Sequence, residues 1–81
     1  MLKIVDVKNG ANIEGLASRI QKAMDARGMT QADLARATGM STAQVSLIVS
    51  GKTKDPQFRS ILLVADALDV SLNYLAGISR R

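Results

Sequence analysis

The sequence predicts an all-α fold of five helices, preceded by an extended N-terminal segment. From residue 13 onward, apolar residues recur at the three- and four-residue spacing that places them on one face of a helix. Serine, threonine and asparagine caps, together with glycine stops, divide this stretch into five segments. The 81 residues contain no internal repeat and no linker rich in proline or glycine, so one domain is expected.

The first helix is expected from about Ile13 to Arg27. Asn12 is its expected N-cap, and Gly28 supplies the left-handed residue that commonly ends a helix. The apolar positions of this segment share one helix face: Ile13, Leu16, Ala17, Ile20 and Met24.

The second helix is expected to begin after Thr30 and to end at Gly39. The Thr30 hydroxyl can accept a hydrogen bond from the N–H of Asp33, whose carboxylate favours the positive end of the helix dipole. A third helix is expected to follow, because Ser41 and Gln44 have the spacing of a capping box. The apolar pair that should turn this third helix toward the interior is Val45 and Ile48.

Pro56 marks the expected start of the fourth helix, since proline at the first helical position lacks only an N–H that has no helical partner there. Ser71 is expected to cap a short fifth helix, residues 72–76, and Gly77 to terminate it. The expected buried stripe of the fourth helix is Phe58, Ile61, Leu62, Ala65 and Leu68.

Residues 1–11 differ from the rest of the chain. Apolar residues roughly alternate with polar ones here, and Asn9-Gly10 is a turn signal, so an extended segment is expected. It is open whether this segment forms a loose tail, packs on the core or pairs with its counterpart in a dimer. Residues 12–78 would then form the folded domain, and residues 79–81 a basic C-terminal tail.

The composition excludes several classes of function. The chain has no cysteine and no histidine, which removes disulfides and the usual side chains of zinc sites and of nucleophilic catalysis. We therefore expect no enzyme activity, no metal, no cofactor and no small-molecule substrate. The longest apolar run, residues 61–65, is far shorter than the about 20 residues that a membrane helix needs, so a cytoplasmic protein without a membrane partner is expected.

The charge permits a polyanionic partner. Eleven basic residues against seven acidic ones give a net charge of +4. Only Phe58 and Tyr74 are aromatic, which argues against a single-strand surface built on stacked bases.

The segment around Gly39 has the spacing of a helix-turn-helix, because two short helices that meet at about 90–120° need a small side chain at their contact and a glycine in the turn. Here "MTQADLARATGMSTAQVSLIVSGKTKDP", followed by "ALDVSLNYLAG", resembles the lambda-repressor/Cro-like family, also called the xenobiotic response element family. The resemblance covers about residues 13–77.

The resemblance implies that the third helix is a recognition helix that enters the major groove of DNA. The pattern of the helix itself agrees, since residues 42, 43, 46 and 47 lie opposite the side expected to be buried. By resemblance, the side chains that face the bases are Thr42, Ala43, Gln44, Ser46 and Leu47.

Two roles are open for Gln44. As the last residue of the capping box it can fold back onto the N–H of Ser41. A glutamine that reaches outward can instead bond an adenine through N6 and N7. One side chain cannot satisfy both roles fully.

The resemblance also implies contacts with the DNA backbone. Lys52 and Lys54 match loop positions that touch phosphate in relatives, and the start of the fourth helix offers main-chain N–H groups to the same strand. The expected phosphate contacts are Gln31, Lys52, Lys54, Gln57 and Phe58.

Two positions depart from the family pattern. Many relatives pair an arginine of the first helix with a glutamate of the recognition helix, whereas the corresponding positions here are Met24 and Val49. We expect an apolar contact in place of that ion pair. Relatives often carry a polar or basic residue at the position of Leu47. A leucine side chain cannot hydrogen-bond a base, so we expect it to contact a thymine methyl or a sugar edge.

The function that the resemblance implies is sequence-specific binding of double-stranded DNA by a phage or bacterial repressor or Cro-like regulator that occludes its operator. A homodimer on a palindromic operator is expected, since one small module reads only a few base pairs. Two alternatives are an antitoxin with the same fold and a helical protein-interaction module that does not bind DNA. The expected dimer contact consists of Leu72, Tyr74, Leu75 and Ile78.

Overall fold

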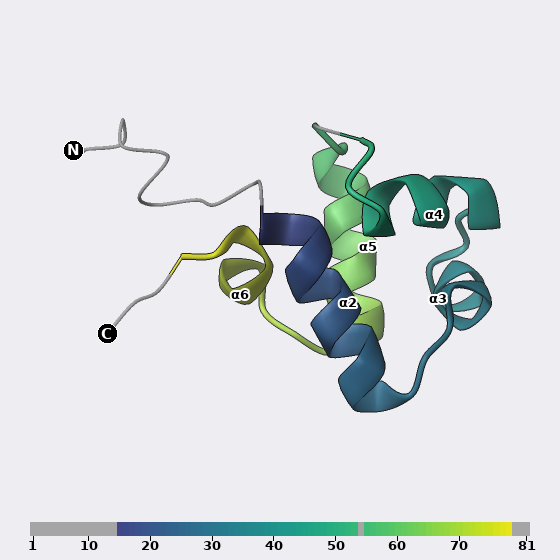
Figure 1. Cartoon of the computed structure of the whole chain (residues 1–81), viewed down its shortest axis with the longest axis horizontal. Helices are drawn as coiled ribbons and strands as arrows, with labels where there is room; N and C mark the ends of the chain where they lie inside the picture. The colour runs from purple at the N-terminus through teal and green to yellow at the C-terminus, as the bar shows by residue number, and fades with distance from the viewer. Residues whose placement is uncertain (1–14, 54, 79–81) are drawn as a thin grey trace.

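The computed structural model describes residues 15–53 and 55–78, and these residues fold as an all-α domain (Figure 1). The expected extended segment, the Asn12 cap, Lys54 and the basic tail lie outside the described residues. The prediction of an all-α fold with five helices is confirmed for the described part of the chain. The helices are α2 (Leu16–Arg27), α3 (Gln31–Thr38), α4 (Thr42–Val49), α5 (Phe58–Leu68) and α6 (Leu72–Ala76).

The helices α2 and α5 stand at the centre of the fold and contact each other (Figure 1). The short helix α6 packs on both of them at one side. On the other side, α3 contacts α5 and α4 contacts α2, and α3 and α4 also contact each other. The two helices of the predicted helix-turn-helix are therefore held against the central pair.

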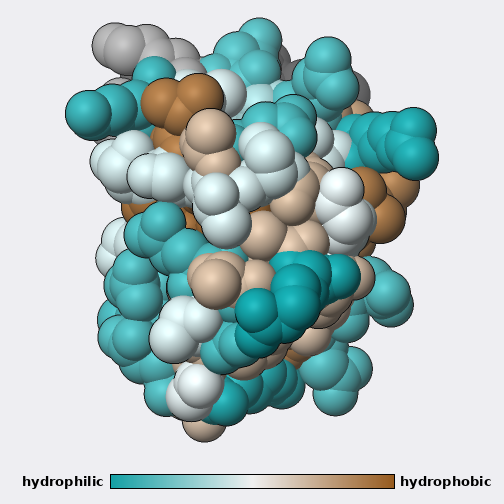
Figure 2. Space-filling model, turned by 90° about the vertical axis from the view of Figure 1, so that its right-hand side faces the viewer, coloured by the Kyte–Doolittle hydropathy of each residue, from teal (hydrophilic) through white to brown (hydrophobic). Residues whose placement is uncertain are grey.

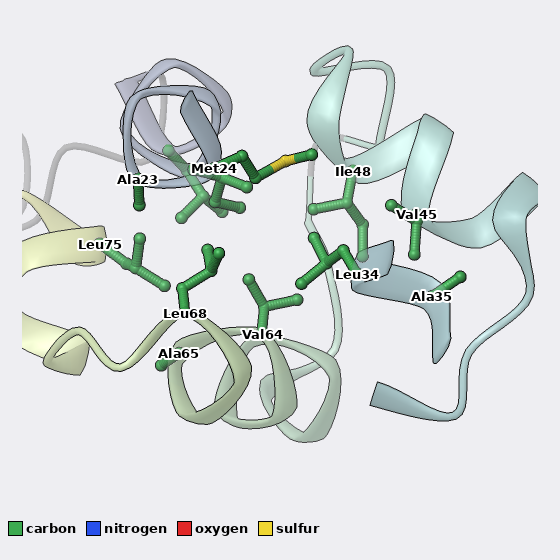
Figure 3. Close-up of a cluster of buried hydrophobic side chains, with 12 residues drawn as sticks. Ala23, Met24, Leu34, Ala35, Val45, Ile48, Val64, Ala65, Leu68 and Leu75 are labelled. Atoms are coloured by element: carbon green, nitrogen blue, oxygen red, sulfur yellow. The ribbon is translucent and has the colours of Figure 1, made fainter. Parts of the chain in front are cut away.

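One apolar cluster, to which all five helices contribute, forms the core (Figure 3). In Figure 3 the side chain of Met24 extends from α2 toward Ile48 of α4, and Leu68 and Val64 rise from α5 toward the same interior. Burying a large aliphatic side chain of this kind stabilises a fold by about 1.5–3 kcal/mol. The side chains that are almost completely buried are Ile20, Met24, Leu34, Val45, Val64, Leu68 and Leu75.

The apolar replacement of the family's ion pair agrees with this core. Met24 is almost completely buried, and the half-buried Val49 packs against the same apolar cluster. No charged group of α2 or α4 needs to be desolvated there, which removes the main cost of a buried ion pair.

The described part of α2 begins at Leu16, with Gly15 as its N-cap, and no side chain caps it. Ile13 and Glu14, which belong to the expected first turn, lie outside the described residues. The predicted stop at Gly28 is confirmed, with φ at 65°.

The start and the buried face of α5 also differ from the prediction. The helix begins at Phe58 with Gln57 as N-cap, so Pro56 precedes the helix instead of occupying its first turn. Phe58 and Leu62, expected in the buried stripe, are 68% and 42% exposed. The interior face consists of Val64, Ala65 and Leu68, with Ile61 half-buried beside them.

The helix α6 has the predicted ends. The Ser71 hydroxyl accepts a hydrogen bond from the N–H of Tyr74 at 2.9 Å, and Gly77 ends the helix at a φ of 75°. The turn that leads into α6 contains Asp69, a non-glycine residue with φ at 56°. The side chain of Arg27 donates a hydrogen bond to the carbonyl oxygen of Asp69 at 3.3 Å, which links the end of α2 to this turn.

Acid should weaken the N-terminal cap of α3. The N–H of Thr30 donates to the Asp33 carboxylate at 2.9 Å, and this bond, the Thr30 side chain and the nearby Arg36 guanidinium lower the pKa of Asp33. A carboxyl whose pKa is lower in the folded state stabilises the fold above its unfolded pKa, and this contribution disappears as the pH falls through the folded pKa. We expect the free energy of unfolding to fall below a pH of about 4.

The test compares urea unfolding, followed by circular dichroism between neutral pH and pH about 3, of the wild type and Asp33→Asn. Asparagine keeps an acceptor for the N–H of Thr30 but cannot titrate. The free energy of unfolding of Asp33→Asn should therefore change less with pH than that of the wild type. Asp66→Asn, which removes an exposed carboxylate from α5, should keep the wild-type slope. Parallel profiles of the wild type and Asp33→Asn would contradict the expected role of this carboxylate.

Candidate nucleic-acid interface

The turn between α3 and α4 is fixed by backbone and side-chain bonds. Gly39 adopts the left-handed conformation, with φ at 80°, and its N–H donates to the carbonyl of Ala35 at 2.9 Å. The buried hydroxyl of Thr38 donates to the carbonyl of Leu34 at 2.8 Å and accepts from the N–H of Met40 at 3.3 Å. Because these bonds span the end of α3 and the turn, they set the direction in which α4 leaves.

The orientation of α4 agrees with the sequence prediction. Val45 and Ile48 are buried, whereas Thr42, Ala43, Gln44, Ser46 and Leu47 are exposed. Figure 2 views the molecule from the side of α3 and α4, and residues of weak hydropathy lie across the middle of its upper half, between strongly hydrophilic residues and a few strongly hydrophobic ones. The outer face of α4 presents only uncharged side chains, of which Gln44 and Leu47 are the larger ones.

Both members of the capping box at the start of α4 are in place. The hydroxyl of Ser41 accepts from the N–H of Gln44 at 3.1 Å, and Oε1 of Gln44 accepts from the N–H of Ser41 at 3.3 Å. The structure thus shows Gln44 in the capping role that the sequence left open. Its Nε2 group has no hydrogen-bond partner among the described residues, and Gln44 is exposed.

The loop after α4 is fastened to the end of that helix. The N–H groups of Lys52 and Thr53 both donate to the carbonyl of Leu47, at 3.0 and 3.2 Å, and Gly51 turns the chain with φ at 80°. The exposed Lys52 therefore has its backbone held beside the outer end of α4. This place fits the expectation that Lys52 contacts a phosphate.

The start of α5 is the second expected phosphate contact. Gln57 is its N-cap and makes no side-chain capping bond, unlike the caps of α3, α4 and α6. The N–H groups of the first turn are thus not occupied by a capping side chain, and the helix dipole favours an anion there. Gln57 and Phe58 are both exposed at this end.

Residues of α4, of the loop after it and of the start of α5 line a hollow of about 240 Å³. Gln44 and Leu47 line it from α4, and Gln57 lines it from the start of α5. The structure therefore brings two of the expected base contacts next to one expected phosphate contact. The carboxylate of Asp55 also belongs to this lining.

Other predicted residues lie elsewhere. Gln31 is exposed in the first turn of α3 and does not line the hollow. Of the expected dimer residues on α6, Tyr74 is 40% exposed, and Leu72 and Ile78 are half-buried. The assignment of Leu75 to the dimer contact is wrong, because its side chain is completely buried in the core of its own chain.

Two residues outside the predicted set of contacts belong to this region. Thr38 braces the turn through its hydroxyl, and the sequence signal was a threonine directly before the glycine that ends α3. Arg59 lines a second hollow of about 260 Å³ between the start of α5 and the turn, together with Gln44 and Gln57. Its position adds a cation next to the capped start of α4.

Comparison with known proteins identifies the family of the chain. A family model described as helix-turn-helix, of the Cro/C1 type, matches residues 20–75, which include the whole of α3, α4 and α5. No curated protein and no solved structure matches the chain. Among the described helices, none is long and apolar enough to cross a membrane. The match covers more than half of the chain, which therefore belongs to the lambda-repressor/Cro-like family of helix-turn-helix DNA-binding proteins.

Proposed function

We propose that this protein is a repressor that binds a palindromic operator as a homodimer and blocks access to the promoter. The observation that carries the proposal is the outer face of α4, where Thr42, Ala43 and Ser46 are exposed on a helix anchored by two buried side chains. Small side chains allow a helix to approach base edges closely, and the hydroxyl and methyl groups of Thr42 can contact bases directly.

The phosphate contacts in this proposal flank α4. Lys52 lies at one end of the helix, and the uncapped first turn of α5 lies beside it. Gln31, at the start of α3, would bond the backbone on the other side of the groove and brace α4. Neutralised phosphates release counterions, so these contacts would supply most of the affinity.

The dimer would place two copies of α4 in successive major grooves, about 34 Å apart. Its contact is proposed at α6, through the exposed Tyr74 with the half-buried Leu72 and Ile78 at its sides. Two half-sites are needed because one module of this size reads few base pairs.

Selection of binding sites from random duplex DNA is the experiment that tests the function. The expected result is a palindrome with half-site centres about one helical turn apart and an affinity that falls steeply with salt. Recovery of sequences without any shared motif, or binding that does not depend on salt, would overturn the proposal.

Lys52→Ala should weaken binding to every duplex by a similar factor. The side chain is expected to touch a phosphate, so its loss should lower the slope of affinity against salt concentration by about one unit and leave the preferred sequence unchanged. Fluorescence anisotropy on the selected operator and on a scrambled duplex, over a range of salt, measures both quantities. A loss confined to the operator would contradict the phosphate role.

A further inference from the structure

Arg59 lies in the first turn of α5, next to the start of α4. Its side chain lines the hollow of about 260 Å³ together with Gln44 of α4 and Gln57, the N-cap of α5. Met40, in the turn between α3 and α4, lines the same hollow. A cation of α5 therefore faces the end at which the recognition helix begins.

The guanidinium of Arg59 is available to an outside group. Arg59 is exposed, and its side chain has no hydrogen bond or ion pair with any of the described residues. By contrast, Arg27 donates to the carbonyl oxygen of Asp69, and Arg36 pairs with the carboxylate of its neighbour on α3. No carboxylate of the described residues lines the hollow that contains Arg59, so its charge is not neutralised there.

Lys52 and Arg59 lie at opposite ends of α4. The backbone of Lys52 is bonded to the carbonyl of Leu47, near the last turn of the helix, whereas Arg59 shares its hollow with Gln44 of the first turn. The eight residues of α4 span about 12 Å. A phosphate contact at the last turn alone would therefore leave the direction of the first turn free.

We propose that Arg59 binds a phosphate of the DNA and anchors the start of α4, as the counterpart of Lys52 at the other end. This inference rests on the proposed function. Phosphate contacts fix the orientation of a DNA-binding protein, and base contacts then read the sequence. Arg59 would thus hold the first turn, with Thr42 and Ala43, against the base edges. The planar guanidinium can offer two N–H groups to one phosphate.

A phosphate suits Arg59 better than a base does. The exposed row of Thr42, Ala43 and Ser46, which carries the proposed function, does not line the hollow of Arg59. Arg59 also belongs to α5 and not to the recognition helix itself. The side chain therefore lies beside the surface that faces the bases, which is where the sugar-phosphate backbone borders the groove.

The first test measures the salt dependence of binding to a random duplex by fluorescence anisotropy, with the full chain. One phosphate contact contributes about 0.9 to the slope of log affinity against log salt concentration. Raising the salt concentration from about 50 to about 200 mM therefore costs about 3.5-fold in affinity for each contact. In Arg59→Gln, the loss of affinity over this range should be about 3.5-fold smaller than in the wild type.

Two control variants separate the phosphate contact from net charge. Lys22→Gln removes the same unit of charge from α2, where Lys22 is exposed on the side of α6. Since α2 separates α6 from α4 in Figure 1, this variant should keep the wild-type salt dependence. Arg59→Lys keeps the charge and should also keep it. Circular dichroism should show the same helical content in all variants, because none of them removes a printed contact of the core.

The second test finds the phosphate itself. Single phosphates of the selected operator are replaced, one at a time, by the uncharged methylphosphonate. Once a cation has been removed, neutralising its phosphate should cost nothing further, because the two changes remove one interaction. One position in each half-site should therefore weaken the wild type and leave Arg59→Gln unaffected. For Lys52→Ala the unaffected position should be a different one.

Three results would overturn the proposal: an unchanged salt dependence of Arg59→Gln, an equal change in Lys22→Gln, or methylphosphonates that weaken the wild type and Arg59→Gln equally at every position. A loss confined to the operator would overturn it as well, because Arg59 would then read a base. The proposed repressor function fails by a different result, namely selected sequences without a shared motif. The random-duplex measurement still decides the role of Arg59 in that case.

Discussion

Ile48→Ala is expected to lower the free energy of unfolding by about 2–5 kcal/mol. The Ile48 side chain is buried where α4 meets the core, and in Figure 3 it lies among side chains of α2 and α3. Alanine would remove three carbon atoms and leave a cavity that the neighbouring helices can fill only in part. Chemical denaturation followed by circular dichroism measures the loss.

The matched control is Leu47→Ala, one residue earlier in the same helix. Leu47 is 46% exposed, so its truncation should change the free energy of unfolding by no more than about 0.5 kcal/mol. The pair therefore tests the orientation of α4 directly. Equal destabilisation by the two substitutions would mean that the helix is rotated from the orientation described above.

Gln44→Ala is expected to weaken binding to the preferred operator by about 1–3 kcal/mol and to relax the preference at one base position. In the protein without DNA, Oε1 of Gln44 accepts a hydrogen bond from the N–H of Ser41, and Nε2 of Gln44 is available to donate a hydrogen bond to DNA. A rotation of the amide would release Oε1 as well and allow a two-point bond to adenine. Competition between the operator and its single-base variants measures the preference.

Gln44→Glu separates reading of a base from capping of the helix. Glutamate keeps an acceptor for the N–H of Ser41 and favours the positive end of the helix, so the stability of α4 should be retained. It cannot donate to a base, and its charge weakens binding to every duplex. The ratio of operator to random-duplex affinity is therefore the decisive quantity, and an unchanged ratio in both variants would leave Gln44 as a cap only.

Local signals in the sequence were sufficient to define α3, α4 and α6. The caps Thr30, Ser41 and Ser71 each bond an N–H within the next three residues, so the bond depends only on the nearby chain. The stops Gly39 and Gly77 likewise act through their own backbone conformation. Such features need no knowledge of the tertiary structure.

The buried face of α5 could not be chosen in the same way. The segment holds more apolar residues than one helix face can bury, and two overlapping stripes satisfy the helical spacing. Packing against α2 and α3 selects the stripe of Val64 and Leu68 and leaves Phe58 and Leu62 exposed. That selection depends on how the helices meet, which is information from outside the segment.

The candidate site could likewise be predicted only in part from the sequence. The exposure of Thr42, Ala43 and Ser46 follows from the burial of their neighbours on the same helix. The resemblance supplied Lys52, whereas the bonds that fasten its loop to Leu47 appear only in three dimensions.

The division of α4 into two buried anchors and an exposed row has a consequence for how such a regulator evolves. Substitutions at Thr42, Ala43 or Ser46 alter what the helix presents while Val45 and Ile48 keep it docked. Under the proposed function, such substitutions would change the DNA sequence that α4 prefers and leave the fold intact. The same three positions would form a small library for retargeting the protein in the laboratory.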